Sequence, residues 1–308
     1  MSIVIISDRD PKAWLSALKS KAPEVEVSVY PDVHDKQKVD YALVWNYPHG
    51  ALKEFPNLKV VASMGAGVDH IMSDPELPKD VMVTRVVDVQ LGIDMAEFVL
   101  AVVLAHLRNL LVHKGAEPLK QWQPRPYFRI ADPKIGIMGM GILGNRVAEK
   151  LKKAGFNVTG WARTQRSNRD FGIFSGKEEL ESFLSEIHIL VCLLPLTPLT
   201  ENILNKDLFS KLPKNAFVIN VARGRHLVEK DLLEYLDNGH LSGAALDVFR
   251  EEPLPENHPF WEHPKVHVTP HIASVSRPAS VVGQVLENYR RLHNDQPLGN
   301  TVEVSKGY

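Results

Sequence analysis

The segment "KIGIMGMGILGNRVAEKL" (residues 134–151) decides the fold of this chain. A short apolar run precedes Gly139, Gly141 and Gly144, which have the spacing G-x-G-x-x-G, and a helical pattern follows. In this motif the first glycine permits a tight turn, the second lets a pyrophosphate approach the backbone, and the third lets the helix pack closely. The N-terminus of the helix adds free N–H groups and a positive dipole end. The segment therefore predicts a strand–turn–helix unit that binds a dinucleotide.

The next strand of this unit ends in "TGWARTQRS" (159–167), which lacks an acidic residue. In the NAD form of the motif, an acid at this point accepts hydrogen bonds from the ribose hydroxyls. Ala162 stands there instead and leaves room for a 2′-phosphate, which Arg163 and Arg166 could bind and to which Thr164 could add a hydroxyl. Alternatively, these are solvated loop residues. With the glycine motif upstream, the sequence favours NADPH over NADH.

The composition is that of an ordinary globular protein. The 308 residues exceed one compact domain, so two domains are expected. A net charge of −1 argues against general nucleic-acid binding. The single cysteine, Cys192, cannot form an internal disulfide, which fits a reducing compartment. The N-terminus has no signal-peptide pattern and the longest apolar run (98–107) is too short to span a bilayer, so a cytoplasmic protein without membrane contact is expected.

Short β-branched runs alternate with helical patterns along the chain, which indicates parallel sheets with crossover helices. A long helix is expected over 94–111, a proline-rich loop over 117–128 and a last amphipathic helix over 277–294. The expected strands are 3–7, 26–30, 42–45, 59–63 and 81–85 in the first part, and 134–139, 158–162, 187–195, 216–222, 244–249 and 266–270 in the second. The pattern predicts two α/β units.

Three strands of the second part end in residues that suit the reduction of a carbonyl. Arg223 ends one strand, Asp247 ends another with Glu252 close behind, and His271 ends the last. The carboxyl ends of parallel strands share one edge, so these side chains could converge. A histidine can donate a proton near neutral pH, a carboxylate can orient it, and an arginine can hold a carboxylate or a developing alkoxide. Taken singly, each could also be a surface or structural residue.

Six motifs occur in one order along nearly the whole chain: "GAGVDHI", "MGMGILG", "LLPLTPLT", "NVARG", "LDVFREEPLP" and "TPHIAS". In these the sequence resembles the D-isomer-specific 2-hydroxyacid dehydrogenases. "LVW", "GWART", "SRPA" and the final "GY" are most similar to the glyoxylate/hydroxypyruvate reductase A type of that family. The resemblance implies two Rossmann-like doubly wound domains with parallel sheets and an active site in the cleft between them. It also implies a discontinuous substrate domain (1–95 plus 278–308) and a dinucleotide-binding domain (96–277).

The resemblance also implies the activity and its residues. The expected reaction is the NADPH-dependent reduction of glyoxylate and hydroxypyruvate to glycolate and D-glycerate. His271 would be the acid/base, Glu252 its charge partner and Arg223 the residue that binds the 2-oxoacid, while Asp247 would meet the nicotinamide carboxamide. The cofactor is expected to contact Asp247 and, at the end of the strand that follows the glycine motif, Ala162, Arg163, Thr164 and Arg166. The other expected contacts are Gly139, Met140, Gly141, Ile142, Leu143, Gly144, Leu194, Pro195, Thr200, Val221, Ala222 and Ala273. No metal is expected.

By the same resemblance, the backbone of Gly65, Ala66 and Gly67 should bind the substrate carboxylate. The glycines would let successive N–H groups face an anion, although an ordinary strand-to-helix turn would use the same glycines. Trp45 would form a wall of the pocket, and Arg277 could reach an anionic substrate or serve on the surface. The family commonly forms homodimers around the nucleotide domain, partly through the long helix.

Two other functions stay open at this point. A dinucleotide-sensing regulator could use the same fold, since fold alone does not fix function. Against it stands the complete set of Arg223, Glu252 and His271. Another dehydrogenase of the same fold, of the D-lactate, phosphoglycerate or formate type, is also possible. Ala162 disfavours the members that use NAD, and the chain lacks the additional regulatory domain that longer phosphoglycerate enzymes often carry.

Overall fold

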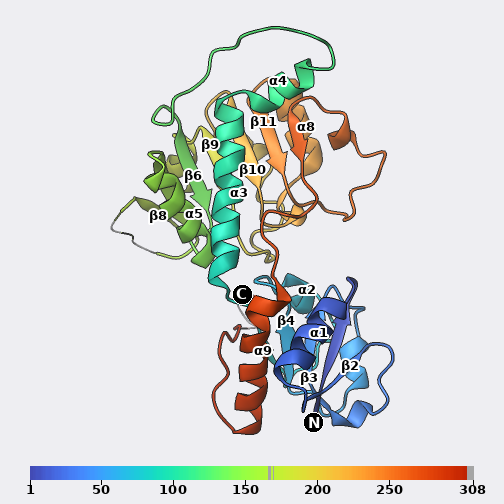
Figure 1. Cartoon of the computed structure of the whole chain (residues 1–308). Helices are drawn as coiled ribbons and strands as arrows, with labels where there is room; N and C mark the ends of the chain where they lie inside the picture. Colours follow the sequence, from blue (N-terminus) through green and yellow to red (C-terminus); the bar gives the residue numbers. More distant parts are fainter. Residues whose placement is uncertain (166–167, 169, 304–308) are drawn as a thin grey trace. The chain divides into compact units, whose positions relative to one another are not determined.

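The computed structural model describes residues 1–165, 168 and 170–303, and the chain divides into two compact α/β units (Figure 1). The first comprises Met1–Val89 and Val275–Tyr308, and the second comprises Gln90–Ser274. The boundaries expected from the sequence, after residues 95 and 277, lie slightly later. They differ because the long helix begins at Val89 and nearly all of it belongs to the second unit, as does the strand-end segment up to Ser274.

The first unit contains a five-stranded parallel sheet with the order β2-β1-β3-β4-β5. Its elements are β1 (Ser2–Ser7), α1 (Lys12–Lys21), β2 (Glu26–Val29), η1 (Lys36–Lys38), β3 (Val39–Trp45), η2 (Ala51–Glu54), β4 (Val60–Ser63), α2 (Asp69–Met72), β5 (Met82–Thr84) and α9 (Pro278–His293). The central strands β1 and β3 are buried on both faces, as expected for a parallel sheet covered by helices. The last helix of the chain, α9, packs against α1 and completes this unit.

The second unit contains a seven-stranded parallel sheet with the order β12-β11-β10-β9-β6-β7-β8. Its elements are α3 (Val89–Leu107), α4 (Leu110–Ala116), β6 (Lys134–Met138), α5 (Ile142–Lys153), β7 (Asn157–Ala162), β8 (Ile173–Ser175), α6 (Leu180–Leu184), β9 (Ile189–Cys192), α7 (Lys206–Phe209), β10 (Ala216–Asn220), η3 (Gly224–His226), α8 (Glu229–Asp237), β11 (Leu241–Leu246), η4 (Pro259–Trp261) and β12 (Val266–Val268). The two parallel sheets confirm the predicted α/β class.

The register of the second sheet aligns the carboxyl ends of its strands. Met138 of β6 pairs with Cys192 of β9, Cys192 with Asn220 of β10, Asn220 with Leu246 of β11, and Leu246 with Val268 of β12. The residues that follow these five therefore leave the sheet at the same edge. Strand order reverses between β6 and β9, and such a switch point is where open α/β sheets bind ligands.

The predicted helix over 94–111 is in fact two helices. α3 begins at Val89 and ends at Leu107, and α4 follows from Leu110. Asn109 lies between them with a left-handed φ of 54°, and its side chain donates a hydrogen bond to the carbonyl oxygen of Pro126 at 2.7 Å. An asparagine adopts this conformation at a modest cost, so the chain can turn here. The three-residue edge strand β8 is a further element absent from the prediction, since it is too short to give a periodic pattern.

α3 is apolar and long enough to meet the length and composition test for a membrane span. In this structure it packs on the second unit through one face, which includes Met95, Val99 and Val103. These residues contact the cluster formed by β6, α5 and β9. One face of α3 therefore belongs to the core of the second unit, and Figure 1 shows the helix lying across the sheet.

Two histidines lie beside Phe217 of β10 on this side of the sheet. The His106 ring stacks on the Phe217 ring with 3.9 Å between centroids, and His267 lies 6.4 Å from the same ring. Burial, with a smaller effect from the charge of His267, lowers the pKa of His106 to about 4. Burial also lowers the pKa of His267. Both rings are therefore neutral in the folded protein at neutral pH.

Acid should destabilise the protein through His106. Below pH 6.5 the unfolded chain binds a proton at this residue, whereas the folded protein does so only near pH 4. The free energy of unfolding should therefore fall as the pH drops from 6.5 to 4, by about 2–3 kcal/mol from this group alone. Urea unfolding at several pH values should show a smaller decrease for His106→Gln than for the wild type. Parallel curves for the two proteins would contradict this assignment.

Candidate active site

The glycine turn between β6 and α5 has the shape that the motif predicts. Gly139 has a left-handed φ of 106°, and its N–H donates a hydrogen bond to the carbonyl oxygen of Trp161 at 2.9 Å. A Cβ atom at Gly144 would lie 1.9 Å from the carbonyl oxygen of Gly139, so this glycine lets the helix pack on the turn. A Cβ atom at Gly141 would meet nothing within 4 Å. Open space thus lies in front of the helix N-terminus, where the motif places a pyrophosphate.

The other residues of the turn differ in exposure. Met140 is buried, whereas Ile142 is exposed and Leu143 is half-buried in the first turn of α5. Asn145, which the sequence analysis did not single out, donates from its side-chain amide to the carbonyl oxygens of Met140 and Gly141 at 3.1 and 2.9 Å. This asparagine holds the turn in shape. In the sequence, only its position directly after Gly144 could have pointed to this role.

β7 ends without a carboxylate, as the sequence indicated. Ala162 is its last residue and is buried, Arg163 is half-buried and Thr164 is exposed. Arg166, the second predicted phosphate ligand, lies outside the described residues. The edge at which an NAD-type acid would stand therefore presents a methyl group followed by a cation.

The loop after β9 is held by its own threonines. Thr200 is buried, and its hydroxyl donates to the carbonyl oxygen of Pro195 at 2.7 Å and accepts from the N–H of Thr197 at 2.9 Å. Leu194 is buried, while Pro195 is exposed at the surface of the loop. Thr200 was expected to contact the cofactor. That contact stays a prediction, and in the structure the hydroxyl fixes the shape of the loop.

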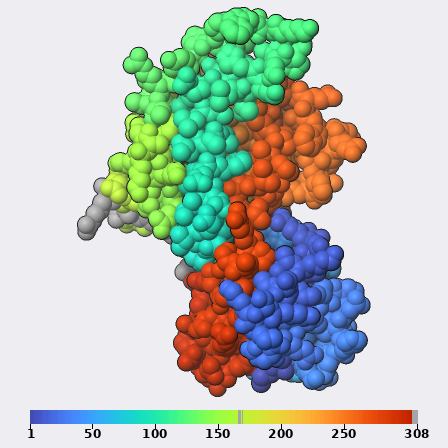
Figure 2. All heavy atoms as spheres, viewed as in Figure 1, coloured from blue at the N-terminus to red at the C-terminus, as the bar shows by residue number. Residues whose placement is uncertain are grey.

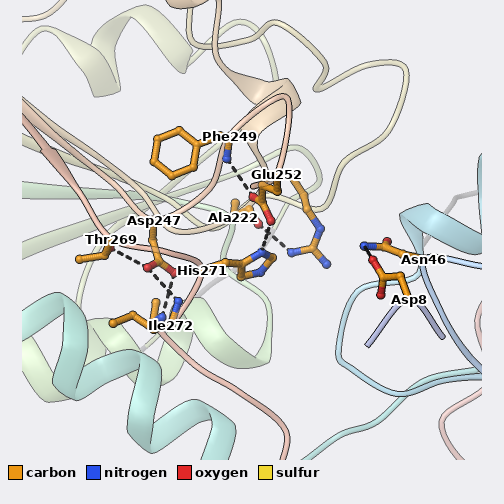
Figure 3. Close-up of polar contacts among 11 residues, drawn as sticks. Asp8, Asn46, Ala222, Asp247, Phe249, Glu252, Thr269, His271 and Ile272 are labelled. Atoms are coloured by element: carbon orange, nitrogen blue, oxygen red, sulfur yellow. Dashed lines mark hydrogen bonds and ion pairs between the residues drawn. The ribbon is translucent and has the colours of Figure 1, made fainter. Parts of the chain in front are cut away.

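Asp247, the first residue after β11, organises the end of the neighbouring strand (Figure 3). Its side chain is buried, and Oδ1 accepts hydrogen bonds from the Thr269 hydroxyl at 2.6 Å and the Ile272 N–H at 3.0 Å. Oδ2 accepts from the N–H of Ala273 at 2.8 Å. The contact of Asp247 with the nicotinamide carboxamide stays a prediction. In the structure its carboxylate binds the segment on both sides of His271, and Thr269 is a partner for which the sequence gave no signal.

His271 has an unusual backbone conformation. Its φ of 53° lies in the left-handed region, which is costly for a residue with a side chain. The main chain of Asp247 compensates in part, because its carbonyl oxygen accepts the His271 N–H at 2.8 Å. The Asp247 side chain binds the next two residues. The turn is thus held at several points, and the direction of the imidazole is fixed with it.

The imidazole of His271 pairs with Glu252. Nδ1 lies 2.7 Å from Oε2 of Glu252, and Oε1 accepts the Phe249 N–H at 2.9 Å (Figure 3). Burial raises the pKa of Glu252. Two effects lower it by more: the hydrogen bonds from His271 and Phe249, and the charges of His271 and Arg223. The net shift of the pKa is therefore downward. Glu252 is therefore ionised at neutral pH, and its Oε2 can accept a hydrogen bond from Nδ1 of the imidazole. Nδ1 is engaged, which leaves Nε2 to exchange a proton with another molecule.

Arg223 follows β10 and lies near this pair. One guanidinium nitrogen donates to the carbonyl oxygen of Ala222 at 2.7 Å, and the positive charge lowers the pKa of Glu252. Gly224 explains this proximity, because a Cβ atom there would lie 1.8 Å from the carbonyl carbon of Phe249. The segments after β10 and β11 touch at this glycine. Within the second unit the structure therefore brings together the three residues predicted to be catalytic.

The predicted cofactor residues Val221 and Ala222 are buried at the end of β10. The N–H of Val221 donates to the carbonyl oxygen of Cys192 at 3.4 Å, which continues the pairing of β10 with β9 for one more residue. Ala273, another predicted cofactor residue, is buried, and its N–H is bound by Asp247. All three lie at the carboxyl edge of the sheet, and their contact with a cofactor stays a prediction.

In the first unit, a turn after β4 presents N–H groups. Ser63 is buried, and its hydroxyl accepts the N–H of Gly65 at 3.1 Å and donates to the carbonyl oxygen of Gly67 at 2.7 Å. Within the described residues, no protein acceptor receives the N–H of Ala66 or of Gly67. The N–H groups of Ala66 and Gly67 are thus available to an anion, while that of Gly65 is engaged by Ser63. Binding of a carboxylate by this turn stays a prediction.

Trp45 explains the need for a glycine at position 65. A Cβ atom at Gly65 would lie 2.6 Å from the six-membered ring of Trp45, so only a glycine accommodates the indole. The guanidinium of Arg9 lies 5.1 Å from the centre of the Trp45 ring. Trp45 thus forms a wall beside the turn. In the same first unit, the side-chain amide of Asn46 donates a hydrogen bond to the carboxylate of Asp8 at 3.2 Å (Figure 3). Arg277, the other predicted substrate residue of this unit, is exposed immediately before α9.

Comparison with known proteins gives one consistent result. Residues 100–273 match the family described as D-isomer specific 2-hydroxyacid dehydrogenase, NAD binding domain. The glyoxylate/hydroxypyruvate reductase A of Yersinia enterocolitica is 40% identical over 97% of each chain, and that of Escherichia fergusonii is 41% identical over the same shares.

Two solved structures cover the whole of this chain with a TM-score of 0.93. One is a D-isomer-specific 2-hydroxyacid dehydrogenase from Xanthobacter autotrophicus Py2 in complex with NADPH and MES, 40% identical, of which 99% is covered. The other is an NADPH-dependent glyoxylate/hydroxypyruvate reductase from Sinorhizobium meliloti in complex with NADP and sulfate, 38% identical and covered completely. The ordered motifs, the two parallel sheets and these likenesses together show that the chain belongs to the family of D-isomer-specific 2-hydroxyacid dehydrogenases.

Proposed function

We propose that this protein reduces small 2-oxoacids with NADPH, glyoxylate and hydroxypyruvate first, to the corresponding 2-hydroxy acids, glycolate and D-glycerate. The observation that carries the proposal is the pair of His271 and Glu252, with 2.7 Å between Nδ1 and Oε2, beside Arg223 at the carboxyl edge of a dinucleotide-type sheet. Relatives that bear this activity in their names match almost the full length of the chain. A solved relative with NADP bound has the same fold.

The cofactor would be held at the switch point of the second sheet. The turn at Gly139 and Gly141 and the first N–H groups of α5 would take the pyrophosphate. Ala162 would leave room for the 2′-phosphate, and Arg163 would supply positive charge beside it. NADPH, when bound, supplies a hydride to the carbonyl carbon of the substrate. A carboxylate at the end of β7 would repel the 2′-phosphate, so its absence supports NADPH over NADH.

His271 would act as the acid during reduction. Ionised Glu252 would accept a hydrogen bond from Nδ1 and orient the ring. Nε2 would then donate its proton to the carbonyl oxygen as negative charge develops there. In the reverse direction the same nitrogen would accept the hydroxyl proton. The rigid turn around His271, held by Asp247, keeps the imidazole in one direction during this exchange.

Each unit, taken by itself, has groups that could bind an anionic substrate. Arg223 can bind a carboxylate or a carbonyl oxygen with two donors, and its charge would stabilise a developing alkoxide. The N–H groups of Ala66 and Gly67 would bind the substrate carboxylate, with Trp45 beside them. Arg277 is exposed and could add positive charge. Both anchors suit a small acid with a carbonyl next to its carboxylate.

The exposed apolar surface of the second unit supports a homodimer. The outer face of α3 and the segment that follows it are uncovered in Figure 2. Trp122 is 94% exposed. Other exposed apolar side chains there include Ile93, Leu110, Val112, Leu119, Tyr127 and Phe128. A surface of this kind is typical of a protein interface. We propose that a second copy of the chain covers it, and that the enzyme works in the cytoplasm without nucleic-acid or membrane partners.

Two glycine variants should separate cofactor binding from packing. Gly141→Ala places a methyl group in the open space of the turn, so the Kd for NADPH should rise by about tenfold or more while the unfolding midpoint changes little. Gly144→Ala forces a methyl group against the carbonyl oxygen of Gly139 and should lower stability by about 3 kcal/mol or more. NADPH fluorescence and urea unfolding measure the two effects. Unchanged NADPH binding by Gly141→Ala would place the pyrophosphate elsewhere.

Removal of the acid/base should abolish turnover and leave cofactor binding intact. For His271→Gln, the initial rate of glyoxylate or hydroxypyruvate reduction should fall on the order of 10²–10⁴-fold, because Gln cannot transfer a proton. The matched control is His263→Gln. His263 also pairs with an acid in the second unit, at 3.3 Å from Asp237, and its loss should leave kcat unchanged. A His271→Gln enzyme with nearly wild-type kcat would rule out this assignment.

A further inference from the structure

We infer that His226 is a positioning residue that joins the substrate-binding arginine to the loop beside the cofactor. His226 ends η3, three residues after Arg223, and its side chain is completely buried. The sequence analysis gave it no role. The inference rests on the proposed function, because it concerns how the residues of that reaction are held.

The two ring nitrogens of His226 face two different segments. Nδ1 lies 3.1 Å from the carbonyl oxygen of Arg223, and Nε2 lies 3.3 Å from the carbonyl oxygen of Pro195. Arg223 follows β10 and is the proposed substrate ligand, whereas Pro195 belongs to the loop after β9, next to the glycine turn. One buried ring therefore connects the substrate side of the site with its cofactor side.

Both carbonyl oxygens also receive hydrogen bonds from their own segments. The side-chain amide of Asn220 donates to the carbonyl oxygen of Arg223 at 3.0 Å. The hydroxyl of Thr200 donates to that of Pro195 at 2.7 Å. Asn220, His226 and Thr200 thus form a row of buried polar side chains under the site, in which His226 is the member that reaches both loops. Such a fully buried polar network holds one arrangement of its parts.

The chemistry of the ring suits this connection. A carbonyl oxygen only accepts hydrogen bonds, so a ring nitrogen that bonds to it must carry a hydrogen. A neutral imidazole carries one such hydrogen and donates to one of the two carbonyls in each tautomer, whereas a protonated ring donates to both. Asparagine would place an amide nitrogen near the position of Nδ1, and glutamine would place one near the position of Nε2. Each substitution therefore keeps one half of the connection and removes the other. Histidine is the side chain that can contact both carbonyls from position 226.

The main chain around His226 is anchored independently of the ring. The N–H of Leu204 donates to the carbonyl oxygen of His226, and that of Asn202 donates to the carbonyl oxygen of Arg225, both at 2.9 Å. Substitution of the ring should therefore leave η3 attached to the 202–204 segment. A change in catalysis would then report on the connection between the two loops rather than on loss of the local fold.

The test compares His226→Asn and His226→Gln in the full-length protein. His226→Asn retains the contact with Arg223, so the KM for glyoxylate should stay near the wild-type value and the Kd for NADPH should rise about three- to tenfold. His226→Gln retains the contact with Pro195, so the Kd for NADPH should stay near the wild-type value. The KM for glyoxylate should rise about three- to tenfold. Fluorescence titration gives the Kd without turnover.

A matched pair of controls is available at His240. Its Nε2 also faces two carbonyl oxygens, those of Phe209 and Leu212 at 3.0 and 3.1 Å, but these lie at the end of α7, away from Arg223. His240→Asn and His240→Gln should lower the unfolding midpoint and leave the KM and the Kd unchanged.

Two results would overturn the inference. Both His226 variants could keep the KM and the Kd within about twofold of the wild type. Alternatively, each variant could raise both the KM for glyoxylate and the Kd for NADPH, together with a lower unfolding midpoint. The two variants would then not differ in which constant changes. A wild-type protein that binds NADPH but reduces neither 2-oxoacid would instead contradict the proposed function. In that case the Kd values of the two variants still decide whether His226 holds the cofactor loop.

Discussion

The buried carboxylate of Asp247 is the interaction on which the candidate site depends. The carboxylate accepts hydrogen bonds from one hydroxyl and two N–H groups of the turn after β12. The main-chain carbonyl oxygen of Asp247 accepts a further hydrogen bond from the N–H of His271. Such a group is costly to bury unless its oxygens are bound, and here the bonds also compensate for the left-handed backbone of His271. If Asp247 were lost, the turn would lose the contacts that point the imidazole toward Glu252.

The remaining parts of the site follow from the parallel sheet. Its register brings the ends of five strands to one edge, so the glycine turn and the loops after β9, β10, β11 and β12 emerge together. Close packing then brings the loops into contact, most clearly where Gly224 touches the backbone of Phe249. Arg223 and Glu252 become neighbours for this reason, and the charge of Arg223 helps to keep Glu252 ionised. The chemistry of the site is thus a consequence of sheet geometry and of one glycine.

The sequence predicted those features that are local or that repeat. The spacing of Gly139, Gly141 and Gly144 predicts the turn because the strand, turn and helix are consecutive in the chain. The motif also marks the position of the acid in NAD-type sites, and Ala162 stands there. Contacts between distant segments were not readable. No pattern shows that Thr200 bonds to Pro195, or that Gly65 makes space for an indole that lies twenty residues earlier in the chain.

The same limit applies to the protein contacts of Asp247 and to element boundaries. Asp247 was given a cofactor contact by resemblance, whereas its protein partners could be seen only once β12 lay beside β11. The long helix was predicted as one segment because the pattern is apolar throughout, and the break at Asn109 depends on a hydrogen bond to Pro126 across a loop. A buried histidine such as His226 has no sequence signal either, since its two partners come from separate strands' loops.

The most direct measurement of the central claim is the cofactor preference of the wild type and of Ala162→Asp. Initial rates of glyoxylate reduction would be recorded with NADPH and with NADH for both proteins. The account predicts a kcat/KM at least about tenfold higher with NADPH for the wild type, and a loss or reversal of this preference when a carboxylate stands at the end of β7. A wild type that uses NADH as well as or better than NADPH would contradict the account.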